Sequence, residues 1–519
     1  MPTRFLAGLI KTSQDTTTNR WSKVSWWVVL LILLAATFIR VGESVPWRNE
    51  FFYLARLIRT FDPSYIPVDW TLGTGAPEHF AFNHLFGGLG LVLPLEVLGW
   101  VGRVAFWTIN LWTLLLIAKR LAINPWSTAV VIAVWLGMGQ SLVGYSWIFG
   151  TFEAKVVAYA ILHLGLLLCF QGRIPLVGLA AGLAFTFHPS VGLWGGLALA
   201  GMAVFTDRNP RKLSSAAGLA IVGALPGLLA VFPMLRAEHG ATVDDWRLMV
   251  LIKMPHHLDP KSWPIANRLL VGFMFAFNLF HARATGSIKW RQLALFQILT
   301  GLPFLLGLAF RQLEAWQSLS YFPFRLFPLY TPLFFGFAVA DGLGRRDAIR
   351  LPRTAIAIAI LCLISLPNPY IRYVHAVPRR MHPVVEVDTG LRACCEWIRG
   401  ELPTDAQGIA PPGLDREIWY YAERGLIVSS EFQSYHRLSE WRQRVESLGG
   451  EMTASRTRRQ DLLEHYDQLT ETELRSIIHR YNPDFVIARQ IYDLPLGFDS
   501  GSFRVYLPAS GMANNTPTD

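Results

Sequence analysis

Nine charged or histidine residues in aromatic stretches of the chain have side chains suited to binding or transferring an anionic group. Arg, Lys and His donate hydrogen bonds to phosphate, and a carboxylate can remove a proton or hold a metal ion. The residues are Glu50, Asp69, Glu153, Lys155, His188, His256, His257, Arg311 and Arg325. They come from widely separated segments, so a common site requires elements that bring those segments together.

Glu50 and Asp69 flank a predicted helix in the segment NEFFYLARLIRTFDPSYIPVDW. Phe51, Leu54 and Leu57 recur in it at helical spacing, which predicts an amphipathic helix. A carboxylate at a membrane surface can serve as a general base or a metal ligand. Acidic residues also stabilise the start of a helix, so a structural role for Glu50 stays open.

Glu153 and Lys155 lie in TFEAK, where an aromatic loop enters a strongly apolar run. Charges at that depth are costly and usually face a cavity or each other. Their spacing places them on different faces of a helix, so they need not pair. An interfacial ion pair is the alternative interpretation.

The sequence supports a binding role less strongly for His188 than for His256 and His257. His188-Pro189 fits a helix that ends at proline, with a histidine at the interface. His256 and His257 lie beside Asp259 in MPHHLDP and could bind a metal, contact a phosphate or shuttle protons. Adjacent side chains point apart in regular structure, which favours a phosphate or sugar contact over zinc.

Arg311 and Arg325 bracket a segment rich in Trp, Tyr and Phe. The planar guanidinium suits bidentate phosphate recognition, and aromatic walls suit a lipid or a sugar. Reaching to lipid headgroups is the alternative. Arg325, in FPFRLFPLY, is the stronger candidate because apolar residues surround it.

The composition is that of an integral membrane protein. Of 519 residues, 52% are hydrophobic and 16% are charged, whereas soluble chains carry roughly 25% charge. The net charge of +10 could suggest nucleic acid. Much of the excess lies in short loops between apolar runs, so we expect contact with anionic lipid headgroups and no nucleic acid partner.

About eleven apolar runs are long enough to be predicted as membrane spans. They cover roughly 25–41, 99–118, 125–144, 155–172, 174–188, 190–206, 214–235, 267–282, 292–310, 328–342 and 354–371. Counting residues 80–98 as a further span would invert every later loop. We therefore interpret that Gly-rich segment, broken by Pro94, as re-entrant or interfacial.

Lys and Arg crowd one set of loops and the N-terminal tail, which marks them as cytoplasmic. These residues are Arg4, Lys11, Arg20, Lys23, Lys119, Arg120, Arg173, Arg208, Arg211, Lys212, Arg283, Lys289, Arg291, Arg345, Arg346, Arg350 and Arg353. All nine candidate residues then fall outside or at the outer edge. No small-residue cleavage site follows the first apolar run, which favours an uncleaved signal-anchor helix.

The predicted organisation has three parts. A cytoplasmic tail covers residues 1–24, and a multi-pass domain with a long first outer loop at 42–98 covers 25–384. Residues 385–519 form a soluble outer domain, predicted to be α/β. In it, Thr470 and Glu473 have capping-box spacing, Asn482-Pro483 ends that helix, and DFVIA reads as a buried strand.

Several classes of site are missing from the sequence. It has no P-loop, GxSxG, HExxH or suitably placed GxGxxG motif, which argues against a nucleotide-driven pump or a soluble-type hydrolase. The four cysteines show no zinc spacing, and the adjacent Cys394 and Cys395 are poorly placed to bridge each other.

The layout resembles that of the GT-C superfamily, polytopic glycosyltransferases that use polyprenyl-phosphate-linked sugars. The shared features are an acidic residue in a long first outer loop (Asn49-Glu50, then Asp69), many spans with short inside loops, and a soluble outer C-terminal domain. The runs FEAK, FHPSVGLW, KMPHHLDP and FPFRLF are also similar to those of uncharacterised bacterial membrane proteins with this architecture.

The resemblance implies an all-α multi-pass domain and a set of residue roles. Glu50 would be the catalytic base with Asp69 as substitute, and a divalent cation such as Mg²⁺ or Mn²⁺ could be held nearby. The implied contacts to substrate and lipid phosphate are Arg325, Lys155, His256, His257, His188, Arg311 and Glu153. The first loop lacks an Asp-Glu or Asp-Asp pair and the outer domain lacks Trp-Trp-Asp, which argues against an oligosaccharyltransferase and leaves the acceptor open.

The sequence thus predicts an inverting glycosyltransferase of the bacterial inner membrane, with a cytoplasmic N-terminus and a periplasmic C-terminal domain. Its partners would be membrane lipids, a polyprenyl-phosphate-sugar donor and an unknown glycan, lipid or protein acceptor. A transporter or flippase of an anionic lipid or sugar is one alternative. Transporters usually place charges near the midplane and show internal repeats, neither of which is seen here. A catalytically inactive scaffold is the other alternative.

Overall fold

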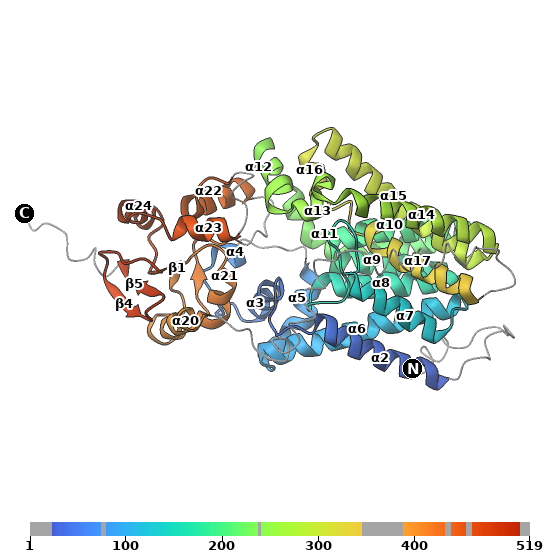
Figure 1. Cartoon of the computed structure of the whole chain (residues 1–519), viewed down its shortest axis with the longest axis horizontal. Helices are drawn as coiled ribbons and strands as arrows, with labels where there is room; N and C mark the ends of the chain where they lie inside the picture. Colours follow the sequence, from blue (N-terminus) through green and yellow to red (C-terminus); the bar gives the residue numbers. More distant parts are fainter. Residues whose placement is uncertain are drawn as a thin grey trace, which may run out of the picture.

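A computed structural model describes residues 23–73, 79–236, 240–344, 388–430, 437–452 and 459–508. A bundle of apolar helices occupies one end of the molecule and a smaller α/β unit the other, with α3 and α4 between them (Figure 1). The end of the bundle that faces the α/β unit is called the outer end below.

Ten helices build the bundle within the described residues. They are α2 (Lys23–Val41), α6 (Leu95–Arg120), α7 (Pro125–Gly137), α8 (Ala154–Phe170), α9 (Ile174–Phe187), α10 (Pro189–Thr206), α11 (Pro210–Arg236), α14 (Ile265–Thr285), α15 (Ile288–Gln312) and α17 (Phe327–Gly344). Each predicted span before residue 345 falls on one of them, and the run at 354–371 lies outside the described residues. Five of the ten, α6, α10, α11, α14 and α15, are long and apolar enough to cross a membrane. The protein is a multi-pass membrane protein.

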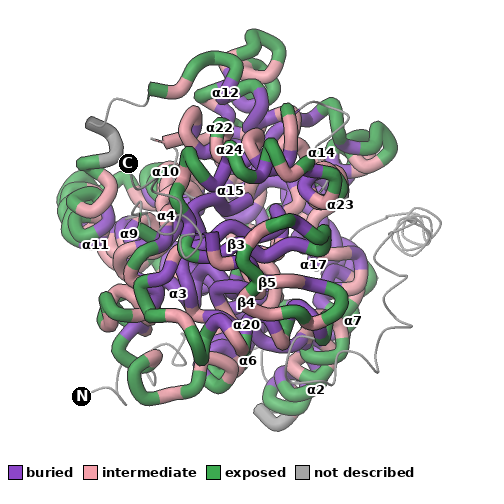
Figure 2. The backbone as a smooth tube through the Cα atoms, turned by 90° about the vertical axis from the view of Figure 1, so that its left-hand side faces the viewer, coloured by how far each residue is buried: buried purple, intermediate pink, exposed green. Residues whose placement is uncertain are grey.

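The outward faces of the bundle are apolar, as contact with lipid requires. On α11, Ile221, Val222 and Leu229 are each more than three-fifths exposed. Figure 2 shows buried segments in the centre of the molecule and exposed ones on α11 at its edge. A side chain left in lipid loses nothing by being apolar, so this exposure is consistent with a membrane environment.

One predicted span is shorter than expected. The apolar run was predicted to remain helical to residue 144, but α7 ends at Gly137. Gly139 and Gln140 then adopt positive φ, which breaks the helix. The Gln140 side chain accepts hydrogen bonds from the Ile148 and Phe149 backbones and holds residues 138–153 as an irregular loop. That loop lies at the outer end and forms part of the site described below.

The first outer loop is helical in short pieces. It contains α3 (Glu50–Phe61), α4 (Trp70–Gly73), α5 (Phe80–Phe86) and the 3-10 helix η3 (Gly87–Leu91). In α3, Phe51, Leu54 and Leu57 are buried, as the amphipathic spacing predicted. Neither α5 nor η3 is long enough to cross a bilayer, so residues 80–98 do not form a helical span.

Two further outer segments connect the later helices. The first contains α12 (Val243–Leu248), the π-helix η4 (Met249–Lys253), α13 (Pro255–Leu258) and η5 (Pro260–Ser262). The second contains α16 (Trp316–Leu319). These segments carry the predicted His256, His257, Arg311 and Arg325 at or beside the outer end.

The C-terminal unit is α/β, as predicted. Its helices are α20 (Thr389–Glu401), α21 (Asp415–Glu417), the π-helix η7 (Ile418–Ala422), α22 (Leu438–Gly449), α23 (Arg459–Tyr466) and α24 (Glu471–Tyr481). Its strands are β1 (Gln407–Ile409), β2 (Gly425–Leu426), β3 (Phe485–Ala488), β4 (Leu496–Asp499) and β5 (Arg504–Tyr506). They form one sheet in the order β2-β1-β3-β5-β4, parallel across β2-β1-β3 and antiparallel across β3-β5-β4.

Local sequence signals in this unit are confirmed. The capping box of Thr470 and Glu473 is present at the start of α24, and Asn482 ends the helix in the left-handed conformation. Strand β3, within DFVIA, is buried along its whole length. The signals succeeded because each depends on residues close together in the chain.

Candidate functional site

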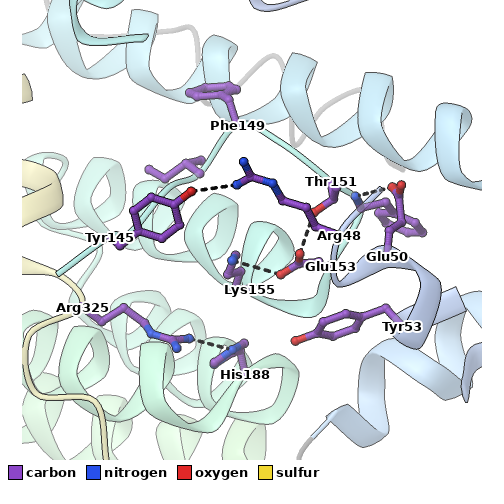
Figure 3. Close-up of polar contacts among 12 residues, drawn as sticks. Arg48, Glu50, Tyr53, Tyr145, Phe149, Thr151, Glu153, Lys155, His188 and Arg325 are labelled. Atoms are coloured by element: carbon purple, nitrogen blue, oxygen red, sulfur yellow. Dashed lines mark hydrogen bonds and ion pairs between the residues drawn. The ribbon is translucent and has the colours of Figure 1, made fainter. Parts of the chain in front are cut away.

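Cationic and aromatic side chains from separate elements meet at the outer end of the bundle (Figure 3). Lys155, in the first turn of α8, lies 3.0 Å from Glu153 and 3.3 Å above the centre of the Trp147 ring. Arg48, just before α3, donates a 2.9 Å hydrogen bond to the Tyr145 hydroxyl. The long irregular loop between α7 and α8 thus supplies the aromatic partners of both cations.

Arg325 lies beside the same group. Its Nη1 is 3.1 Å from Nε2 of His188, and its guanidinium stacks 4.3 Å from the Phe322 ring centre. His188 occupies the junction of α9 and α10, where its Nδ1 accepts from the Val191 backbone. Arg325 is half-buried, and within the described residues no carboxylate forms an ion pair with it. A desolvated guanidinium of this kind attracts an anion. Lys155, His188 and Arg325 are called the cation cluster below.

Three further histidines surround the cluster as neutral groups. Nδ1 of His257 lies 3.0 Å from the Gly144 carbonyl, and its ring packs on Tyr145 and His256. Burial lowers the pKa of His257 well below its usual range, and the neighbouring His256 and Arg325 disfavour its protonation further. His257 is therefore neutral at physiological pH.

His79, in the first outer loop, was not predicted as a site residue. Its Nε2 lies 3.0 Å from the Tyr53 hydroxyl, and its ring lies 5.4 Å from His188. Burial, then Arg56, Arg325 and Lys155, lower the pKa of His79 to about 3. Its Nδ1 is buried and has no hydrogen-bond partner among the described residues. In the sequence its only signal is a histidine within the aromatic run after Pro77.

A cavity of about 610 Å³ lies next to the cluster, between the ends of α2 and α7 and the start of α14. Its lining includes Arg48, Tyr145, Trp147, Thr151 and His256. Glu43 is the only carboxylate in the described lining. This size and this mixture of aromatic walls with a few polar groups are typical of small-molecule sites.

Glu43 was also missed in the sequence. It lies two residues after α2, in the half-exposed turn that leads to the cavity. Its position in the sequence could have identified it, because it is the first carboxylate after the first apolar run. The longer amphipathic segment that begins at Glu50 masked it.

Glu50, predicted as the base, is fully buried and saturated with hydrogen bonds. Its Oε1 accepts from Arg103 Nε at 2.9 Å and from the Phe152 backbone at 2.8 Å. Its Oε2 accepts from Arg103 Nη2 and from the Trp47 backbone at 3.0 Å. Because a carboxylate offers about four acceptor positions, none remains for an acceptor hydroxyl. Figure 3 shows the side chain at the margin of the polar group, and its geometry favours a structural role.

Asp69 joins the first outer loop to the C-terminal unit. Its Oδ1 accepts from the Leu72 backbone at 2.6 Å, and its Oδ2 accepts from the Trp419 indole at 2.7 Å and the Leu426 backbone at 2.8 Å. A Cβ at Gly425 would come within 1.5 Å of the Val68 carbonyl, so this contact requires glycine. Asp69 is therefore positioned to hold two parts of the protein together.

Two other predicted residues are already paired. Arg311 Nε lies 2.8 Å from Asp259, and its guanidinium stacks 4.7 Å from Trp316, with no contact to the cation cluster. Glu153 is buried and accepts from Thr151 at 2.6 Å as well as from Lys155. The structure therefore brings together Lys155, Glu153, His188, His257 and Arg325, with His256 at the adjoining cavity.

The described residues do not fit a metal site built by the protein. Nowhere in the described ranges do three or more His, Cys, Asp or Glu side chains converge in a way that could hold a metal ion. The oxygens of Glu50 and Asp69 already accept from arginine, indole and backbone donors. A divalent cation needs such oxygens free as ligands, and these two carboxylates do not offer them.

Comparison with known proteins supports the fold. The oligosaccharyltransferase of Archaeoglobus fulgidus, solved with a tethered acceptor peptide containing the NVT sequon, matches 90% of this chain and 69% of its own. The TM-score is 0.50 and the identity 12%. This chain has the fold of that enzyme. The resemblance predicted from the sequence is thereby confirmed at the level of fold.

Other structures of that archaeal enzyme, AglB, give similar values. One contains an inhibitory peptide and a dolichol-phosphate, and another Zn and sulfate; each has a TM-score of 0.47, 12% identity and 89% coverage of this chain. They cover 69% and 68% of the archaeal chain, respectively. No protein-family model and no curated protein sequence matches the chain.

Proposed function

We propose that this protein is a membrane glycosyltransferase that moves a sugar from a polyprenyl-phosphate donor to an acceptor on the outer face of the membrane. The GT-C fold supports the class of reaction. Lys and Arg are concentrated in the loops on one side of the predicted spans. This distribution supports a bacterial inner-membrane location, with the N-terminus cytoplasmic and the C-terminal unit periplasmic.

The observation that carries the proposal is the uncompensated positive charge at the outer end. Arg325 contacts His188, whose ring lies 5.4 Å from that of His79, and Figure 3 shows Lys155 in the same group of side chains. Glu153 is the single carboxylate that forms an ion pair with the cation cluster among the described residues. A lipid phosphate would supply the missing negative charge.

The reaction follows from this placement. An acceptor hydroxyl attacks the anomeric carbon of the sugar while the bond from that carbon to the phosphate oxygen breaks. The bonding electrons leave with the phosphate, and Arg325 and Lys155 stabilise the negative charge that develops there. The proton of the hydroxyl passes to a carboxylate, and inversion at the anomeric carbon results from the single displacement.

Glu43 is the carboxylate best placed to take that proton, because it lines the cavity. Glu50 and Asp69 remain the sequence-based predictions for this role. Replacing each acid by its amide separates the assignments, since an amide keeps the shape and loses the basicity.

The test uses the full-length protein in lipid nanodiscs with a panel of radiolabelled short-chain polyprenyl-phosphate hexoses. We expect transfer by the wild type, and a kcat for Glu43→Gln that falls about 100-fold, within the usual range for loss of a general base. A fully active Glu43→Gln variant would remove Glu43 from the role of base. Absence of transfer from every donor would contradict the proposed function.

A further inference from the structure

We propose that Glu50 and Arg103 form a positioning clamp that sets the geometry of the cavity without touching substrate. This inference rests on the proposed function for its effect on transfer. The clamp itself can be tested without any transfer assay.

Glu50 and Arg103 make hydrogen bonds to each other and to the backbone of two segments. Both side chains are fully buried, and each carboxylate oxygen of Glu50 accepts from one guanidinium nitrogen and one backbone N–H. Arg103 also donates to two backbone carbonyls: Nη1 donates to Glu43 and Nη2 donates to Ser44 at 3.1 Å. The pair therefore fixes four backbone groups in two segments.

The two segments contain residues that line the cavity or contact the cation cluster. The backbone atoms of Glu43 and Trp47 belong to the stretch that carries the cavity residues Glu43 and Arg48. The Phe152 backbone lies directly between Thr151, another cavity residue, and Glu153, the partner of Lys155. Each pinned atom is thus within three residues of a group that faces the cavity or the cation cluster.

Helix α6 packs closely against the segment that contains Phe152. A Cβ at Gly102 would lie 2.4 Å from the Phe152 ring, so α6 approaches this segment as closely as a helix can. The Arg103 side chain extends from the same helix to both segments. Trp107, one turn further along α6, also donates to the Gly150 carbonyl at 3.0 Å, so Arg103 is the α6 residue that is tied to both segments.

A clamp and a simple stabilising pair predict different outcomes. A buried ion pair can often be replaced by apolar residues of similar size without loss of stability, whereas removing one partner leaves a buried charge. The double variant Glu50→Leu with Arg103→Met removes both charges, and it also removes all the hydrogen bonds to Trp47, Phe152, Glu43 and Ser44. It can therefore fold and yet lose the geometry.

The experiment compares this double variant with the wild type by three measurements. Thermal unfolding establishes that the variant folds, and hydrogen exchange reports on segments 43–50 and 150–155. Steady-state kinetics then separates kcat from KM. We expect a folded protein of reduced thermal stability, because four buried backbone groups lose their side-chain partners. Faster exchange should be confined to the two segments, and kcat should be lower by about 100-fold, the size of effect that a misplacement of about 1 Å can have.

Single variants keep the test decisive if the double variant does not fold. Arg103→Lys keeps the charge but cannot form the two-pronged contact, so it should retain the fold and lose part of kcat. Unchanged exchange in both segments, or full activity in a folded double variant, would overturn the clamp. Because exchange is measured without substrate, a failure of the proposed function leaves this result intact and distinguishable.

Discussion

The Glu50–Arg103 pair and the cation cluster both place charge below the protein surface, yet they differ in how that charge is balanced. Glu50 has all its acceptor positions filled by protein donors. Arg325 has a histidine and an aromatic ring as its neighbours and lacks a carboxylate partner in the described ranges. A balanced buried charge indicates structure, whereas an unbalanced one at a cavity indicates a ligand of opposite sign.

The largest expected effect comes from breaking the balanced pair. Arg103→Met should lower the free energy of unfolding by about 3–5 kcal/mol, because it leaves the Glu50 carboxylate buried without its counter-charge. Thermal unfolding in detergent measures this loss. Arg392→Met, which removes an exposed pair with Glu396, is the matched control and should cost at most about 1 kcal/mol. Equal losses of stability in the two variants would contradict the difference between the buried pair and the exposed pair.

Asp69 tests a second balanced carboxylate, at the contact with the C-terminal unit. Asp69→Asn replaces one acceptor oxygen by an NH2 group that donates, so at least one of the N–H donors around it loses its acceptor. This should destabilise the contact by about 1–3 kcal/mol, the usual result of leaving a buried donor without a partner. Limited proteolysis between the bundle and the C-terminal unit should become faster. Asp499→Asn, at an exposed carboxylate of the same unit, should leave the cleavage rate unchanged. No change for Asp69→Asn would show that the contact is held by other groups.

The pH dependence of stability tests the buried His79, which lies next to the cation cluster. The unfolded chain protonates His79 near pH 6.5, whereas the folded protein does so only near pH 3. The stability that depends on neutral His79 is present above pH 6.5 and falls as the pH decreases toward 3, by up to about 1.4 kcal/mol per pH unit. His79→Gln should make this slope shallower between pH 6.5 and 4. An unchanged slope would place the acid sensitivity elsewhere.

The smallest expected effect concerns a feature remote from both regions. Thr470→Ala removes the capping box at the start of α24 and should cost about 1 kcal/mol of stability in the C-terminal unit. Ser500, whose contacts lie at the turn between β4 and β5, offers a comparison in the same unit through Ser500→Ala. Hydrogen exchange along α24 distinguishes the two variants, since Thr470→Ala alone should speed exchange in its first turn.

Much of the fold could be predicted because it depends on local patterns. Apolar runs located the helices up to α17, and the alternation of basic loops placed the candidate residues at one end. The end of α7 was predicted seven residues too late, because Met138, Leu142 and Val143 extend the apolar run beyond Gly137. What ends the helix is the positive φ of Gly139 and Gln140, supported by contacts from residues 148 and 149.

The site itself was predicted only in part, for a different physical reason. Sequence reasoning grouped residues by type and by predicted side of the membrane. Of that group, Lys155, His188, His257 and Arg325 lie together in the structure. It could not distinguish a balanced carboxylate from an available one, because the partner of Glu50 lies 53 residues away in α6. Arg103 was counted within an apolar span, and the roles of Glu43 and His79 became visible only once the cavity and the buried ring nitrogen were seen.

The most direct test of the account is the binding of a fluorescent short-chain polyprenyl phosphate to the protein in nanodiscs. Arg325→Gln is compared with Arg311→Gln, which removes an arginine already paired with Asp259 at the same end. We predict that Arg325→Gln weakens binding by roughly 10- to 100-fold, as expected for loss of one charge-assisted hydrogen bond, and that Arg311→Gln binds as the wild type does. Equal affinity for all three proteins would contradict the central claim that the unbalanced cations hold a lipid phosphate.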